Sequence, residues 1–230
     1  MTAPLTPRLA AEAIGTAFLL AAVVGSGIAG DALSAGNTGL ALLCNAIATG
    51  AALAVLIVIF GPISGAHFNP AVSLAFGIRR ELAWDVVALF ALCQIAGAIA
   101  GTLIAHAMFD LPLIQVSNHA RTGIGQWLAE IVAAFGLLLT IFGTLRHRPD
   151  ATGWAVGLYI TAAYWFTAST SFANPAVTIG RMLTDTFSGI RPVDAPAFIV
   201  AQIIGAALAV WLARFLWPVA ADPVGPARPA

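Results

Sequence analysis

Six stretches of this chain are long and apolar enough to form membrane-spanning helices, and this pattern limits the fold more than any other feature. A helix needs about 20 mostly apolar residues to cross a bilayer. Only 9% of the 230 residues are charged, whereas a soluble domain carries about 25%. The sequence therefore predicts an all-α, multi-pass membrane protein. Its expected spans are 9–30, 40–60, 85–107, 126–145, 152–169 and 195–217.

Two further apolar stretches, 69–77 and 174–183, are too short to span, and each begins with Asn-Pro. A helix accepts Pro best at its first position, with Asn just before it as the N-cap. Both stretches follow a segment rich in small residues. We therefore expect two re-entrant half-helices, which enter the membrane without crossing it.

The second half of the chain repeats the first, with three matched segments in the same order. They pair AEAIGTAFLL with AEIVAAFGLL, FNPAVSL with ANPAVTI, and CQIAGAIAG with AQIIGAALA. Each half, about 9–107 and 126–217, holds an odd number of spans, so the second half is inverted. Inverted repeats place a solute path at their interface near the midplane. We expect one channel domain over residues 1–230, with a disordered tail at 218–230.

Arginine counting predicts the orientation. With an even number of spans, both termini lie on one side, and cytoplasmic loops carry the excess of positive residues. We therefore expect a cell (inner) membrane protein with both termini in the cytoplasm. The terminal side holds Arg8, Arg79, Arg80, Arg146, Arg148, Arg214 and Arg228, and the opposite side holds Arg121, Arg181 and Arg191.

The segments SGAHFNPAVSLAF at 64–76 and SFANPAV at 171–177 resemble the aquaporin, or major intrinsic protein, family. The resemblance implies six spans, two half-helices that meet head to head, and a homotetramer with one pore per subunit. It also implies water, glycerol and other small neutral solutes as partners, besides membrane lipid. It implies no cofactor, no metal and no catalysis. The net charge of zero offers no basic patch for nucleic acid.

The two Asn-Pro-Ala motifs are the expected centre of the pore. Partial positive charge at the two half-helix N-termini repels cations, and the Asn side chains offer amide donors to a passing solute. The Pro residues fix the backbone and the Ala residues keep the junction compact. The motifs are Asn69, Pro70 and Ala71, and Asn174, Pro175 and Ala176. Carbonyls expected to accept from the solute belong to Gly65, Ala66, His67, Ser171, Phe172 and Ala173.

Other polar residues in the spans have structural interpretations. Glu12 and Glu130 occupy matching positions in the two halves, as do Gln94 and Gln202. By resemblance, the two acids bind backbone in the re-entrant segments, and a proton relay is the alternative. The glutamines are expected to make contacts between helices. His67 is expected to be a structural hydrogen-bonding residue rather than a pH gate.

The chain departs from the family at Val177, where most members have Arg directly after the second motif. Ungapped counting from the motifs puts the remaining filter positions at Thr49, Ala162 and Ser171. We therefore expect a wide constriction that is lined by small, uncharged side chains. Arg181 lies one helical turn further on. We expect it in the outer vestibule, with a position in the pore as the alternative.

The stretch SFANPAVTIGR resembles bacterial aquaglyceroporin-like channels of arsenic-resistance operons, of the rhizobial type. That resemblance implies arsenite or related arsenicals, including methylated ones, as solutes of a passive channel. Glycerol, urea or water is the alternative within the channel class. An ion-coupled secondary transporter is the alternative from another class, because such carriers also use inverted repeats and broken helices.

Overall fold

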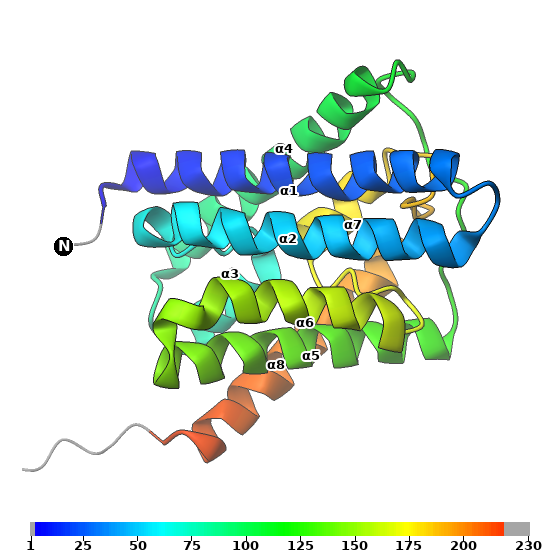
Figure 1. Cartoon of the computed structure of the whole chain (residues 1–230). Coiled ribbons are helices and arrows are strands. Elements are labelled where there is room, and N and C mark those ends of the chain that lie inside the picture. The colour runs from blue at the N-terminus through cyan, green and yellow to red at the C-terminus, as the bar shows by residue number, and fades with distance from the viewer. Residues whose placement is uncertain (1–2, 219–230) are drawn as a thin grey trace, which may run out of the picture.

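The computed structural model describes residues 3–218, which form a bundle of helices (Figure 1). Within these residues, six long helices and two short ones confirm the predicted all-α fold with two half-helices. The long helices are α1 (Leu5–Leu33), α2 (Thr38–Ser64), α4 (Trp84–Met108), α5 (Ile124–His147), α6 (Thr152–Phe166) and α8 (Ala195–Leu216). The half-helices are α3 (Pro70–Ile78) and α7 (Pro175–Arg181), and a 3-10 turn, η1 (Pro149–Ala151), precedes α6. The predicted tail lies almost wholly outside the described residues.

The two halves have matching contacts. In the first half α1 packs against α2 and α4, and in the second α5 packs against α6 and α8. Each half-helix contacts long helices from both halves, since α3 and α7 both pack against α4 and α8. The repeats therefore interlock rather than lie side by side. Helix α1 begins and α8 ends at the same end of the bundle, and the segments 109–123 and 182–194 lie at the other, which we call the distal end (Figure 1).

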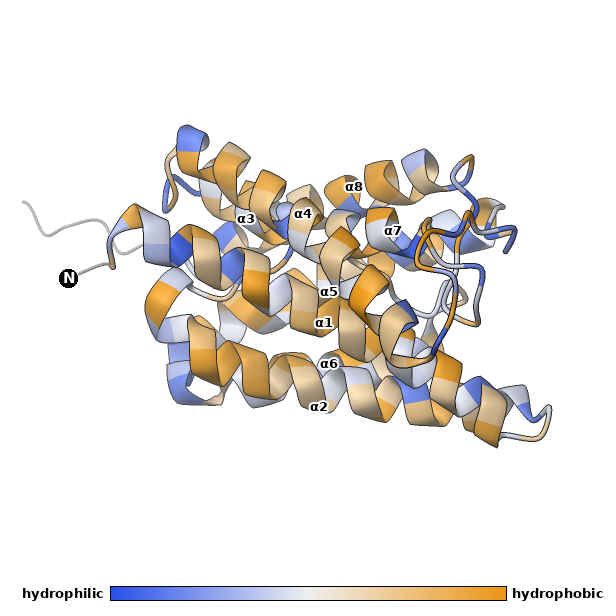
Figure 2. Cartoon of the chain, turned by 90° about the horizontal axis from the view of Figure 1, so that it is seen from above, coloured by the Kyte–Doolittle hydropathy of each residue, from blue (hydrophilic) through white to orange (hydrophobic). Residues whose placement is uncertain are grey.

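The outer surface of the bundle is apolar. Phe18, Leu92 and Leu158 lie well inside α1, α4 and α6, and each is between 61% and 71% exposed. Hydrophilic residues gather mainly at the two ends (Figure 2). Of the helices in the described chain, five are long and apolar enough to cross a membrane. An apolar belt with polar ends is the surface of a multi-pass membrane protein.

Helix α6 is the exception in length. It has 15 residues, which span about 22 Å, so η1 and the segment after Phe166 must complete the crossing. The predicted span ran to residue 169. The helix ends earlier because Thr167 is extended, and Thr170 and Ser171 adopt positive φ angles of 60° and 51°. The chain at this point already belongs to the second re-entrant segment.

Glycines set the distance between α1 and α4. A Cβ atom built on Gly97 would collide with the carbonyl oxygen of Ala13, and one on Gly101 with that of Ala17. Small residues at such positions let membrane helices approach closely, and close contact is the main source of their association. The first-half bundle therefore depends on the absence of a side chain at these two positions.

We predict that Gly101→Ala destabilises the protein by roughly 1–3 kcal/mol, because the added methyl group meets backbone that cannot move aside. Thermal unfolding in detergent measures the effect. Gly61→Ala is the matched control, since a Cβ atom at Gly61 in α2 meets nothing within 4 Å. Equal melting temperatures for the two variants would contradict this account of the α1–α4 contact.

Candidate solute pore

The N-termini of α3 and α7 meet in the middle of the bundle, where each is capped by its own Asn. Asn69 Oδ1 accepts from the backbone N–H of Ala71 at 2.9 Å, and Asn174 Oδ1 accepts from that of Ala176 at 2.9 Å. The Nδ2 groups donate across the junction. Asn69 Nδ2 donates to Ala173 O at 2.8 Å, and Asn174 Nδ2 donates to Phe68 O at 2.8 Å. Each Nδ2 has two hydrogens, so one remains for a solute.

A cavity of about 90 Å³ borders both asparagines and draws its walls from both halves of the chain. It extends from Leu145 and Thr152, near the terminal end of the bundle, to Ser171 and Val177. Its walls are mainly aliphatic. Its polar groups are the two asparagines, the re-entrant segments and the hydroxyl groups of Thr49, Thr152 and Tyr164. The cavity is therefore an apolar tube with a few solute-binding positions.

The motif residues and the expected carbonyl residues lie around this junction. Ala71 and Ala176 are completely buried beneath it, and Pro70 and Pro175 are the first helical residues. Of the expected carbonyl residues, five border the cavity: Gly65, Ala66, His67, Ser171 and Phe172. The carbonyl of Ala173 is instead occupied by Asn69. Phe68, which the sequence analysis did not single out, both borders the cavity and accepts from Asn174. The repeat could have indicated it, because Phe68 and Ala173 precede the two motifs.

Three of the four expected filter positions, Thr49, Ser171 and Val177, border the cavity, but the prediction for Ala162 is wrong. Ala162 is exposed on the outer face of α6, while Tyr164 borders the cavity and its hydroxyl donates to Thr49 Oγ1 at 3.2 Å. Two residues rotate a helix by about 200°, so a small error in counting selects the opposite face. The count failed because the segment from α6 to α7 follows its own course. The lining therefore includes an aromatic ring, where small side chains alone were expected.

The re-entrant segments have an unusual backbone. Ala66 and Phe68 in the first, and Ser171 and Ala173 in the second, all have φ between 49° and 51°. Such conformations cost a non-glycine residue about 1–3 kcal/mol each and need support from their surroundings. Alternation of this kind turns successive N–H groups to one side, which forms a site for an anionic group.

A buried glutamate fills each of these sites. Glu12 accepts from the backbone N–H of His67 at 3.0 Å and of Phe68 at 2.7 Å. Glu130 accepts from the N–H of Phe172 at 2.9 Å and of Ala173 at 2.9 Å. Both side chains are completely buried. These are the contacts expected for a structural role, because they bind the N–H groups of the strained segments.

The two glutamines connect these carboxylates to the half-helices. Gln94 Nε2 donates to Glu12 Oε2 at 2.7 Å and to Ser73 Oγ at 3.0 Å. Gln202 Nε2 donates to Glu130 Oε2 at 2.6 Å and to Thr178 Oγ1 at 2.9 Å. Each network therefore joins two long helices, a re-entrant segment and a half-helix.

His67 borders the cavity, and its imidazole ring is held in place by neighbouring side chains. Its Nδ1 atom lies 3.1 Å from Ser73 Oγ, and its ring packs on Phe76 with centroids 4.6 Å apart. This arrangement fits the structural interpretation, because both the ring and one nitrogen are engaged.

Arg181 differs from the expectation of a side chain in an open vestibule. It is only 1% exposed, and its Nε atom donates to the carbonyl of Ser188. Its guanidinium carbon lies 3.4 Å from the centroid of the Phe172 ring, within the range of a strong cation–π contact. Phe172 also borders the cavity, whereas Arg181 is not among the residues that line it. The segment that follows α7 folds back over the guanidinium and buries it.

Comparison with known proteins places this geometry in context. The family model described as Major intrinsic protein matches residues 2–163 and 148–224. The aquaglyceroporin AqpS of Rhizobium meliloti is 57% identical over 225 residues, which cover 98% of this chain and 93% of that protein. The probable aquaporin AqpM of Archaeoglobus fulgidus is 33% identical, over 94% and 99% of the two chains. The fold also matches the X-ray structure of the aquaglyceroporin from Plasmodium falciparum, with a TM-score of 0.76, 18% identity and coverage of 94% and 98%.

We predict that Glu130→Ala destabilises the protein strongly, by about 1–3 kcal/mol for each backbone N–H left unpaired. Thermal unfolding in detergent, together with size-exclusion chromatography, measures the loss. Glu81→Ala is the control, because Glu81 forms a surface ion pair with Arg79, and such pairs contribute about 0–1 kcal/mol. A melting temperature for Glu130→Ala equal to that of the control would show that the second re-entrant segment does not depend on this carboxylate.

Proposed function

The chain belongs to the major intrinsic protein family, and from this premise we propose an aquaglyceroporin-like channel with arsenite or methylated arsenicals among its solutes. Members of the family are passive channels for small neutral solutes, and this chain is a multi-pass membrane channel of that class. Glycerol, urea and water are the alternative solutes. The proposal includes no catalytic step and no cofactor.

The single observation that carries the proposal is Val177. It borders the cavity directly after the second motif, at the position where most of the family has Arg. The side chain of Val177 makes this part of the cavity wall apolar. Hydroxyl groups in the same lining come from Thr49, Tyr164 and Ser171. A lumen with one apolar side and one hydroxyl-bearing side suits a neutral, polyhydroxylated solute. Arsenite is neutral at pH 7 and roughly the size of glycerol. The 57% identical relative is itself named an aquaglyceroporin.

The buried acids argue against an ion-coupled transporter. Coupling to protons needs titratable groups along the solute path. Among the described residues that border the cavity there is no carboxylate, and both Glu12 and Glu130 are occupied by backbone donors. His67 is the titratable side chain nearest to such a role, and it is held by Ser73 and Phe76.

We also propose an inner-membrane location with both termini in the cytoplasm, and a homotetrameric assembly as the family resemblance implies. The orientation rests on the arginine excess at the terminal end, where Arg214 donates to the carbonyl of Ile78 at 3.0 Å. Arg228, which was counted with this set, lies outside the described residues. Without it the excess of arginine at the terminal end remains.

A stopped-flow panel on proteoliposomes tests the function directly, with water, glycerol, urea and arsenite as solutes and empty liposomes as the control. We expect flux that is proportional to the solute gradient and independent of any ion gradient. Flux that saturates at low solute concentration, or that requires a proton gradient, would refute a passive channel.

We predict that Val177→Arg reduces the flux of glycerol and arsenite by about tenfold or more, equivalent to about 1.4 kcal/mol in the barrier, and reduces water flux much less. The long cationic side chain narrows the lumen and imposes selective desolvation on larger solutes. Val177→Leu is the matched control, because it adds bulk without charge. Undiminished flux of the larger solutes through Val177→Arg would contradict the assignment of Val177 to the filter.

A further inference from the structure

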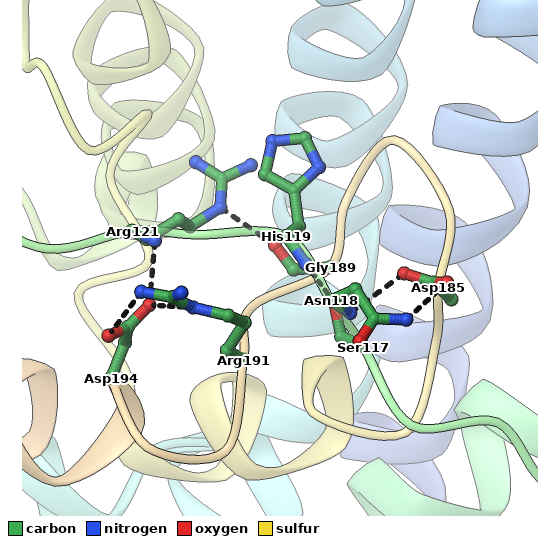
Figure 3. Close-up of polar contacts among 8 residues, drawn as sticks. All are labelled: Ser117, Asn118, His119, Arg121, Asp185, Gly189, Arg191 and Asp194. Atoms are coloured by element: carbon green, nitrogen blue, oxygen red, sulfur yellow. Dashed lines mark hydrogen bonds and ion pairs between the residues drawn. The ribbon is translucent and has the colours of Figure 1, made fainter.

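The segment 109–123, which joins α4 to α5, is fastened to the segment 182–194 at the distal end of the bundle (Figure 3). The backbone N–H of Ser117 donates to Met182 O at 2.9 Å, and that of Arg191 donates to His119 O at 2.9 Å. The backbone and side-chain nitrogens of Asn118 both donate to the carboxylate of Asp185, at 2.8 and 3.1 Å. These bonds hold the segment against the one that follows α7, so the side chains it carries have defined positions.

Arg121 is the most firmly held of these side chains. Its backbone N–H donates to Asp194 Oδ2 at 2.8 Å, and Asp194 in turn binds the guanidinium of Arg191 at 2.9 and 3.2 Å. Its Nε atom donates to Gly189 O at 2.7 Å, and one terminal nitrogen lies 3.3 Å from Ser169 O. In Figure 3 the side chains of Arg121 and His119 point in the same direction, away from Asp185 and Asp194.

The guanidinium of Arg121 lies next to the pore lining. Its central carbon is 5.1 Å from the centroid of the Phe172 ring, and Phe172 and Ser171 both border the cavity. Arg181 contacts the same ring but is buried, whereas Arg121 is partly exposed. Two arginines therefore approach one aromatic wall of the constriction, and Arg121 is the one that solvent reaches.

The charge of Arg121 persists at neutral pH. Burial lowers its pKa to about 10, and the charges of Glu130 and Tyr164 act in the opposite direction. Burial also lowers the pKa of the neighbouring His119, with Arg121 and Arg181 adding to the effect. The imidazole of His119 is therefore neutral at pH 7. Of His119 and Arg121, only Arg121 carries a fixed positive charge.

We propose that Arg121 supplies the fixed cation that position 177 lacks, and that it excludes cations and restricts large solutes at the distal mouth. The inference rests on the proposed channel function. The guanidinium carries its positive charge on a rigid plane, so it repels cations. Its three nitrogens donate to protein oxygens, which fixes the charge in place: Gly189 O, Ser169 O, Thr170 Oγ1 and Phe187 O. Because the charge comes from a connecting segment rather than from α7, the lumen beside Val177 stays uncharged, and the charged group lies in the segment at the distal end.

The test compares Arg121→Gln, Arg121→Lys and Arg148→Gln in proteoliposomes. Potassium and proton leak under an imposed potential is measured with trapped indicator dyes, and glycerol and urea flux by stopped flow. We expect Arg121→Gln to raise the cation leak by about tenfold or more, because the positive barrier is removed, and to raise urea and glycerol flux. Arg121→Lys should retain cation exclusion. Arg148→Gln removes the same charge from an exposed ion pair with Asp150, far from the contacts of Arg121, and should behave as the wild type.

The inference is overturned if folded Arg121→Gln leaks no more than the wild type, or if Arg148→Gln leaks as much as Arg121→Gln. Melting temperature and size-exclusion profile establish that each variant is folded. Should Arg121→Gln not fold, Arg121→Met keeps the apolar stem over Phe172 and is expected to show the same leak. A wild type that passes no neutral solute would refute the channel function instead, so the two failures are distinguishable.

Discussion

Backbone polar groups inside a membrane must find partners within the protein. Here two buried carboxylates bind backbone N–H groups of the two re-entrant segments. Glu12 and Glu130 each bind two successive N–H groups of a re-entrant segment whose residues alternate into positive φ. This arrangement turns the N–H groups away from the lumen and toward the acid. The pore carbonyls, the capped half-helices and the lining of the constriction all depend on segments that would otherwise have no stable course.

The same carboxylates explain why the repeat is visible in the sequence. A glutamate, a glutamine and a hydroxyl residue recur in each half, as Glu12, Gln94 and Ser73 and as Glu130, Gln202 and Thr178. Each set joins elements that are distant in the chain, so losing one member leaves buried polar groups unpaired.

The sequence was sufficient to predict the long helices, both half-helices and the residues at the central junction, because these depend on apolar length and on Asn-Pro capping. It failed where the answer depends on the course of irregular backbone. Ala162 was chosen by counting through a segment with positive φ angles, and Tyr164 on the opposite face of α6 borders the cavity instead. Arg181 was expected in the outer vestibule, but the segment after α7 folds over it and buries it. Arg121 lies in a connection without periodicity, and its contacts to Gly189 and Asp194 are long-range.

The crossed bonds at the centre have a mechanical consequence. Asn69 caps α3 and also binds the segment before α7, while Asn174 caps α7 and binds the segment before α3. Neither half-helix can shift along the pore axis without breaking a bond made by the other, so the waist of the channel behaves as one rigid ring. Any movement that controls flux must then take place outside this ring.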